Sequence, residues 1–374
     1  MTDTLIAGGG LAGAAAACLL GPRATLFERE PAPHDKICGE FISWEAQDAL
    51  TRLGIDVSAL GAAPIDTVRL IHATTIVQAP LPGRGMGLSR RILDAAVLDQ
   101  AERNGARIHR GHAIRRLTPG GLEVDGYSSL VADRVLLATG KHDLRGVRRE
   151  ASPGPLVGLK MFYRLTPDEA DALARHVEII LFPGGYAGLQ PVEHGRANLC
   201  LLISQTVFQQ AGATWPGVLA HLRRTAPHLA RRLHGAQEQI ERPPTIARIP
   251  YGFIHTPTQA DPPSLFRLGD QMAVIPSFSG DGMAIALHTA FAAATATTPA
   301  AYHASLRRTL RPQIARAMLL HRMGQSHPAL LTRAARLWPG ALTWIASLTR
   351  VRKPLPSRRV GAAHNRDASE GKAP

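Results

Sequence analysis

Three glycines near the start of the chain have the spacing that most clearly indicates chemistry. Gly8, Gly10 and Gly13 follow the apolar run Leu5–Ala7 and fit the pattern G-x-G-x-x-G. Between a strand and a helix, the first glycine permits a tight turn and the second lets the backbone approach a pyrophosphate. The third lets the helix pack closely on the sheet. The pattern therefore indicates a phosphate-binding turn.

The residues after these glycines complete a strand–helix–strand unit. Leu11 and Ala12 lead into a predicted helix of small residues, Ala14–Leu20, whose free N–H groups would face the phosphates. A second predicted strand, Ala24–Phe27, ends at Glu28, 20 residues after the first glycine. A carboxylate there can accept hydrogen bonds from both ribose hydroxyls of an adenine nucleotide. The unit predicts an adenine dinucleotide site; the alternative is a structural turn beside a solvated glutamate.

The elements that position this unit belong to a large chain with an uneven charge. The chain has 374 residues, of which 45% are hydrophobic, so it is long enough for two domains and a sizeable core. Its formal charge is +14, but residues 301–374 hold 14 Lys or Arg against two Asp or Glu, which leaves +2 for the first 300 residues. The basic end suggests contact with an anionic surface, or simply a solvated arginine-rich end.

The cysteines and the N-terminus bear on the cellular compartment. Cys18, Cys38 and Cys200 are far apart and form no C-x-x-C pair, so we expect neither a zinc site nor a disulfide framework. No apolar run is long enough to span a bilayer, and no basic segment precedes the glycine motif as in a secretory signal. We expect a cytoplasmic protein, with peripheral contact to the inner membrane face as an open alternative.

Several segments resemble one enzyme family. They are Lys36-Ile37-Cys38-Gly39-Glu40, Ser89-Arg90-Arg91-Ile92-Leu93-Asp94, Ala138-Thr139-Gly140, Gly269-Asp270 and Ser279-Gly280-Asp281-Gly282. Together with the glycine turn, they resemble the flavoprotein monooxygenase superfamily with the para-hydroxybenzoate hydroxylase fold. The resemblance is strongest to the branch that contains geranylgeranyl-reductase-like dehydrogenases and flavin-dependent halogenases, and it covers about residues 1–310.

The resemblance implies FAD as cofactor and a role for each segment. Arg90, with Arg91 as the competitor, would meet the phosphate or ribityl region, and Asp270 would bind a ribityl hydroxyl. Gly280 and Gly282 would bring a helix N-terminus to the pyrimidine edge of the isoalloxazine. The predicted cofactor-binding residues are Gly8, Gly10, Leu11, Ala12, Gly13, Glu28, Arg29, Lys36, Cys38, Gly39, Arg90, Thr139, Gly140, Asp270, Gly280, Gly282 and Met283.

The predicted fold is α/β, or α+β when taken as a whole. A Rossmann-like FAD-binding domain carries an inserted antiparallel β-sheet substrate domain and a helical C-terminus. The predicted parts are residues 1–63, 84–150 and 261–310 for the FAD-binding domain, 64–83 and 151–260 for the substrate domain, 311–354 for C-terminal helices, and 355–374 for a disordered tail.

The C-terminal helices leave two interpretations open. Leucines and the tryptophans Trp338 and Trp344 form an apolar stripe in the segment 328–348, which Pro339-Gly340 interrupts, and arginines flank the stripe. Such a stripe could lie in a membrane interface. Alternatively, it packs on the body of the protein. Contact with nucleic acid is not expected, because aromatic residues are sparse among the charges.

The resemblance predicts a monooxygenase that hydroxylates an aromatic or lipid-like small molecule through a flavin C4a-hydroperoxide. The alternative is an FAD-dependent reductase of an isoprenoid or other lipid double bond. NAD(P)H is the expected electron donor, although Lys141–Gly146 departs from the A-D-G-x-x-S pattern tied to NADPH use. Gly188 and Leu189 stand where halogenases carry tryptophan, which argues against halogenation. No catalytic residue is assigned; His72, His142 and His288 are candidate bases by position only.

Overall fold

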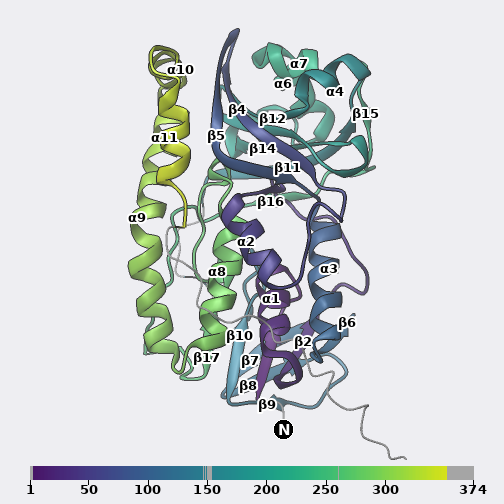
Figure 1. Cartoon of the computed structure of the whole chain (residues 1–374), viewed down its shortest axis with the longest axis vertical. Coiled ribbons are helices and arrows are strands. Elements are labelled where there is room, and N and C mark those ends of the chain that lie inside the picture. The colour runs from purple at the N-terminus through teal and green to yellow at the C-terminus, as the bar shows by residue number, and fades with distance from the viewer. Residues whose placement is uncertain (1–2, 146, 148, 150–153, 260, 352–374) are drawn as a thin grey trace, which may run out of the picture.

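The computed structural model describes residues 3–145, 147, 149, 154–259 and 261–351. The segment 355–374, predicted to be disordered, lies outside the described residues. Figure 1 shows a parallel sheet with its helices in the lower half and a curled mixed sheet in the upper half. Helix α9 runs along one side of both. This arrangement confirms the predicted fold class.

The parallel sheet grows from the glycine-containing unit. Its buried strands are apolar on both faces because both faces are covered. On one face α1 packs against the sheet together with α3 and α8, and on the other face Leu122, Val124 and Leu144 pack against it. Gly13 and the alanines that follow it in α1 allow this close packing, since Ala14 through Ala17 are fully buried. The strand order is β17-β10-β1-β2-β6, with bounds Leu265–Arg267, Arg134–Leu137, Thr4–Ala7, Ala24–Glu28 and Arg107–Arg110.

The mixed sheet joins strands from two separate stretches of the chain. Its order is β15-β11-β14-β13-β12-β4-β5-β3, and β16 pairs with β11. The bounds are Phe41–Ile42 for β3, Ala63–His72 for β4, Thr75–Gly87 for β5, Leu156–Arg164 for β11, Arg175–Phe182 for β12, Gly185–Pro191 for β13, Ala197–Ser204 for β14, Gln237–Glu238 for β15 and Thr245–Ala247 for β16.

One pair in this sheet departs from the antiparallel arrangement that the sequence predicts. Strand β12 runs parallel to β4, whereas the pairs β4–β5, β12–β13, β13–β14 and β11–β14 are antiparallel. Hairpin signals report only pairs that are close in sequence, so they do not show how two distant hairpins meet. A small separate sheet of β7, β8 and β9 spans Ile114–Thr118, Gly121–Val124 and Leu130–Val131.

Local signals set most helix ends. Ser43 and Ser89 each accept a hydrogen bond from the backbone three residues later and so cap α2 and α3. The segment 215–233 forms two helices, because Pro227 begins a new one. The helix bounds are Leu11–Leu20 for α1, Trp44–Arg52 for α2, Arg90–Arg103 for α3, Pro167–Leu173 for α4, Gln205–Gln210 for α5, Trp215–Thr225 for α6, Pro227–Arg232 for α7, Gly282–Thr295 for α8, Pro299–Ser326 for α9, Pro328–Leu337 for α10 and Gly340–Leu348 for α11.

The last helices pack on the mixed sheet. Helices α10 and α11 contact β5, and α10 also contacts β4. Leu342 and Ala335 are buried, which supports the interpretation that these helices pack on the body. Several apolar side chains on the same helices stay exposed, so packing accounts for one face only. Within the described residues, no helix has both the length and the apolar character needed to cross a membrane.

Candidate functional site

The glycine turn presents bare backbone to two cations. A Cβ on Gly13 would stand 2.0 Å from the carbonyl oxygen of Gly8, so only glycine allows this approach. Gly8 itself has φ +103°, which favours glycine. A Cβ on Gly10 would stand 3.5 Å from Lys36 Nζ and 3.7 Å from Arg90 Nη2. The turn and the two side chains therefore surround a space suited to a doubly charged anion.

A buried carboxylate holds these cations in place. Asp94 Oδ1 accepts from Arg90 Nε at 2.7 Å, and Asp94 Oδ2 accepts from Arg90 Nη2 at 2.9 Å and from Lys36 Nζ at 2.9 Å. Burial alone would raise the pKa of Asp94, but the charges of Arg90 and Lys36 outweigh it and lower the pKa. Two cations against one anion leave a net positive charge beside Gly10 for phosphate.

Glu28 closes the other side of the turn. Its Oε2 accepts from the backbone N–H of Gly9 at 2.7 Å, and its Oε1 accepts from the N–H of Glu30 at 3.0 Å. These bonds orient the carboxylate at the end of β2. Glu28, Lys36 and Arg90 line one small hollow, as expected for a ribose next to a pyrophosphate.

A larger cavity of about 160 Å³ brings the predicted segments together. Gly10, Arg90 and Asp270, from three distant parts of the chain, line this same cavity. We call it the dinucleotide cavity. The predicted residues that line it are Gly10, Leu11, Ala12, Cys38, Gly39, Arg90, Gly140, Asp270, Gly280, Gly282 and Met283.

The remaining predicted residues lie elsewhere. Gly8 and Gly13 form the turn behind the cavity, and Glu28 and Lys36 line the smaller hollow. Thr139 Oγ1 donates to the carbonyl of His142 at 2.6 Å. Arg29 is half exposed, pairs with Glu30 at 3.0 Å, and lines neither hollow. Its part in binding a cofactor remains a prediction.

The far end of the dinucleotide cavity is formed by two of the predicted segments, Gly269-Asp270 and Ser279-Gly280-Asp281-Gly282. Asp270 pairs with Lys141 at 3.0 Å, and its charge raises the pKa of Lys141. Gly280 has φ +71°, and Gly282 begins α8, so the first N–H groups of α8 lie at the cavity wall. An added Cβ would meet no heavy atom within 4 Å at Gly140 or Gly282, so backbone faces open space there.

A buried ion pair at the wall of the dinucleotide cavity is a feature that sequence reasoning missed. Lys160 and Glu40, both fully buried, form an ion pair, and Glu40 Oε1 also accepts from the backbone N–H of Arg90 at 3.0 Å. Burial raises the pKa of Glu40 to about 7. Within the described residues, Glu40 Oε2 has no hydrogen-bond partner. A lysine in the middle of the apolar strand β11 was the available signal.

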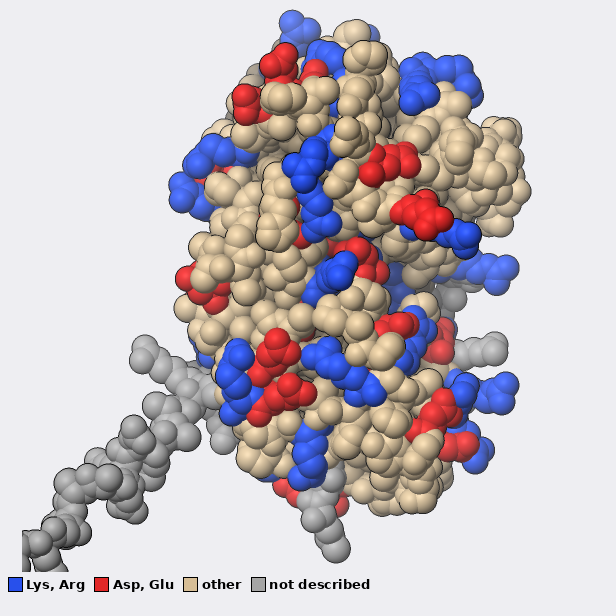
Figure 2. Space-filling model, turned by 90° about the vertical axis from the view of Figure 1, so that its right-hand side faces the viewer, with Lys and Arg blue, Asp and Glu red and all other residues tan. Residues whose placement is uncertain are grey.

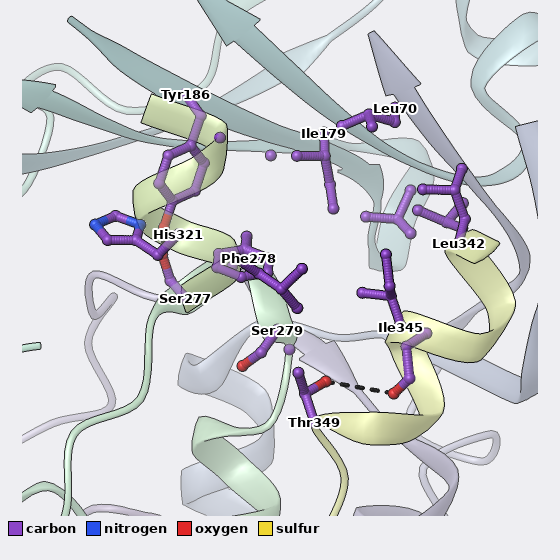
Figure 3. Close-up of a pocket in the computed structure, with 18 of the residues that line it drawn as sticks. Leu70, Ile179, Tyr186, Ser277, Phe278, Ser279, His321, Leu342, Ile345 and Thr349 are labelled. Atoms are coloured by element: carbon purple, nitrogen blue, oxygen red, sulfur yellow. Dashed lines mark hydrogen bonds between the residues drawn. The ribbon is translucent and has the colours of Figure 1, made fainter. Parts of the chain in front are cut away.

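A second cavity, also about 160 Å³, lies beside the first and is almost entirely apolar. We call it the apolar chamber. Figure 3 shows Leu70 and Ile179 from the sheet and Leu342 and Ile345 from α11 pointing into one space. The two cavities share four wall residues, Gly39, Phe41, Ser277 and Gly280. A group bound in one cavity therefore lies next to a group bound in the other.

Polar groups gather at one corner of the apolar chamber. Tyr186 and Tyr251 both hydrogen-bond Ser277 Oγ, at 2.8 and 3.1 Å. The ring of His321, from α9, lies 5.9 Å from that of Tyr186 and stacks on Phe278. Burial lowers the pKa of His321 to about 4, so its ring is neutral at pH 7.

The histidines suggested from the sequence are not the ones at the site. His72, His142 and His288 line neither cavity, whereas His321 lines the apolar chamber. Sequence reasoning overlooked His321 because it lies on a C-terminal helix outside the resemblance. It reaches the chamber because its ring packs against Tyr186, Tyr251 and Phe278, which are distant from it in the sequence.

The residues at the dinucleotide cavity fit an adenine dinucleotide with a planar ring system. The glycine turn and its paired cations suit a pyrophosphate, and Glu28 suits a ribose. Asp270 can accept from a polyol hydroxyl. The free backbone at Gly140 and Gly282 forms a cradle that a Cβ would fill, and Glu40 Oε2 can accept one more hydrogen bond.

Comparisons with known proteins bear on the fold. No protein-family model matches the sequence, and no curated protein matches it either. Among solved structures, the flavin-dependent brominase Bmp2 has TM-score 0.76 and 16% identity over 93% of each chain. PqsL, a probable FAD-dependent monooxygenase from Pseudomonas aeruginosa, has TM-score 0.68 and 16% identity over 87% of this chain and 97% of its own.

A third neighbour is the myxobacterial chondrochloren halogenase CndH, described as a variant of FAD-dependent halogenases. It has TM-score 0.68 and 16% identity over 96% of this chain and 93% of its own. At such identities these likenesses establish the fold alone. The chain thus has the fold of flavin-dependent halogenases and of PqsL.

Proposed function

We propose that this chain is an FAD-dependent oxidoreductase, and specifically a monooxygenase that acts on an apolar or aromatic molecule in the apolar chamber. The observation that carries the proposal is the adjacency of two different cavities. One is lined by the dinucleotide segments, the other by apolar side chains, and they share Gly39, Phe41, Ser277 and Gly280. A redox cofactor beside a dry chamber is the arrangement that such a reaction requires.

FAD would supply the two-electron redox chemistry. Arg90 and Lys36 would hold its pyrophosphate, Glu28 its adenosine ribose, and Asp270 a ribityl hydroxyl. The N-terminus of α8 would stabilise negative charge at the pyrimidine edge. We propose NAD(P)H as the electron donor, either directly or through a separate reductase.

The chamber would bind and orient the substrate. Its apolar walls exclude water and favour an apolar body. Its polar corner, formed by Tyr186 and Ser277, would hydrogen-bond a hydroxyl or carbonyl of the substrate, and Tyr251, which lines the dinucleotide cavity, hydrogen-bonds Ser277 from the other side. Because burial lowers the pKa of His321 to about 4, its ring is neutral at pH 7 and can donate or accept a hydrogen bond near that corner.

Two neighbouring chemistries compete with hydroxylation. The apolar lining also favours reduction of an isoprenoid or other lipid double bond, which needs no oxygen. Halogenation is the activity in the names of several neighbours, but Gly188 and Leu189 replace the tryptophan of the halogenase segment. We therefore keep the reductase as the second candidate.

The test is a product screen with purified protein, FAD, NADPH and a panel of phenols, quinones and polyenes. A monooxygenase yields a product that carries one atom of labelled oxygen from O2. Saturation of a double bond without oxygen supports the reductase. A colourless protein that cannot be loaded with FAD overturns both.

Gly188 offers a variant that addresses the chamber alone. It lines the chamber, and a Cβ there would lie 3.8 Å from its nearest heavy atom, the carbonyl oxygen of Cys200. Gly188→Phe should fill the chamber and abolish turnover while FAD binding persists, and Gly188→Ala should retain turnover. Unchanged turnover in Gly188→Phe would contradict substrate binding in the chamber.

A further inference from the structure

Helices α10 and α11 form a wall with two different faces. The inner face lines the apolar chamber through Leu331, Leu342 and Ile345. Two contacts fix this wall to the body: Thr343 Oγ1 donates to the carbonyl of Pro80 at 2.7 Å, and Arg350 pairs with the buried Asp281 at 2.6 Å. These contacts hold the helices in place, so the outer face is a defined part of the surface of the folded protein.

The outer face gathers exposed apolar side chains. Among the described residues, eight large hydrophobic side chains are exposed, and six of them lie on or between α9, α10 and α11. Leu337 is 89% exposed, and the rings of Trp338 and Trp344 stack with centroids 6.3 Å apart. We call the four of these that lie on α10, on α11 or between them the tryptophan–leucine face: Leu330, Leu337, Trp338 and Trp344.

The helices that carry this face contain no acidic residue and carry arginines, so their own charge is of one sign. The sequence from Gly282 to Val351 contains arginines but no aspartate or glutamate. Arg333 lies between Leu330 and Leu337 at helical spacing, so the three share one side of α10, and Arg336 is also exposed. By contrast, Figure 2 shows basic and acidic side chains interspersed on the side of the molecule away from α9.

We propose that the tryptophan–leucine face docks on the surface of an anionic lipid bilayer. Tryptophan and leucine would enter the boundary between headgroups and acyl chains, and the arginines would meet the anionic headgroups. A second copy of the chain fits this face less well. A symmetric pairing would bring the arginines of both copies together without any carboxylate from this segment.

Docking here would place the apolar chamber one layer of helices from the lipid. That consequence rests on the proposed function, but the docking itself does not. FAD content and vesicle binding are separate measurements, so one proposal can fail while the other stands.

The experiment is flotation of the full-length protein with vesicles of phosphatidylcholine, alone or with a minority of phosphatidylglycerol. We expect binding to the anionic vesicles that weakens at high salt. The variant L337S/W338S/W344S should lose most of this binding. Its control is I76S/V131S, which removes two exposed hydrophobic side chains that lie on none of the helices α9, α10 and α11 and should bind as the natural chain does.

A second pair of variants tests the charges. R333E/R336E should weaken binding to anionic vesicles by at least about 30-fold. Each basic residue near such a surface contributes about 1 kcal/mol of binding free energy, and the loss of two such contributions corresponds to about 30-fold in affinity. R223E/R224E, two exposed arginines of α6, should change it little. Far-UV circular dichroism and FAD absorbance show that each variant is folded.

Several results would overturn the proposal. These are an absence of flotation by the natural chain, equal flotation of L337S/W338S/W344S, or equal binding to neutral and anionic vesicles. A dimer in solution that this variant converts to a monomer, without vesicle binding, would identify the face as a self-interface. Preference for a soluble acidic polypeptide over vesicles would identify a protein partner.

Discussion

Asp94 shows how a buried carboxylate can prepare a site for an anion. It binds both Arg90 and Lys36, which would otherwise repel each other beside Gly10. The planar guanidinium of Arg90 is held by two bonds to one carboxylate, so its orientation is set before any ligand arrives. Preorganisation of this kind reduces the entropy lost on binding.

Arg90 and Arg91 provide a matched test at this scale. Arg90 lines the dinucleotide cavity, whereas Arg91 is an exposed neighbour that lines only the smaller hollow. Arg90→Ala should weaken FAD binding about 10- to 100-fold, the range expected for a lost hydrogen bond to a charged group. Arg91→Ala should change it by less than a factor of about three. Titration of the apoprotein with FAD, followed by flavin fluorescence, measures both; equal losses would contradict the assignment of Arg90.

Glu40 predicts a pH dependence of stability. Burial raises its pKa from 4.5 to about 7 in the folded chain. Between these pH values the folded state keeps a proton on Glu40 that the unfolded state has released. The free energy of unfolding therefore falls as pH rises from about 4.5, and the stabilisation from this bound proton is lost above about pH 7. Glu40→Gln removes this titrating group. The difference in free energy of unfolding between Glu40→Gln and the natural chain should therefore change by about 1–3 kcal/mol between pH 5 and pH 8.

Urea denaturation at several pH values measures this difference for Glu40→Gln. Its control is Glu102→Gln, an exposed carboxylate on α3 whose difference from the natural chain should stay constant. If the difference in free energy of unfolding from the natural chain is independent of pH for both variants, the raised pKa of Glu40 does not contribute to stability.

At the scale of elements, the sequence predicts best what is local. The turn from β1 to α1 follows from glycines within a few residues of one another, and the break between α10 and α11 follows from Pro339-Gly340. The parallel pairing of β12 with β4 and the arrival of His321 at the apolar chamber depend on packing between distant segments. Their apolar patterns are compatible with several arrangements, so the sequence does not select one.

The two faces of the α10–α11 wall predict that leucine-to-alanine substitutions lower the stability of the fold by unequal amounts. Leu342 is 9% exposed and faces the apolar chamber, whereas Leu337 is 89% exposed. Leu342→Ala should lower the free energy of unfolding by about 2 kcal/mol, at the low end for buried leucines because the chamber already adjoins it. Leu337→Ala should change it by less than about 0.5 kcal/mol. Urea denaturation compares them, and equal effects would contradict the two-faced wall.

At the scale of the whole molecule, the dinucleotide cavity is where the two sheets meet. Gly10 and Asp270 reach it from the ends of strands of the parallel sheet, and Gly158 and Cys200 reach it from the mixed sheet. A ligand that fills the cavity would therefore touch both sheets. A ligand that ends at the pyrophosphate would touch mainly the parallel one.

This difference predicts distinct effects of FAD and ADP on hydrogen exchange. A ligand that binds only the folded chain stabilises it by about 2.7 kcal/mol at a concentration 100 times its Kd. At such matched saturation, FAD and ADP should both slow exchange in the glycine turn around Gly10. Only FAD should also slow local opening of β14 around Cys200, because only its flavin end would reach the mixed sheet. Equal protection of β14 by ADP would contradict contact between the flavin end of FAD and the mixed sheet. It would indicate instead that the cavity binds a mononucleotide.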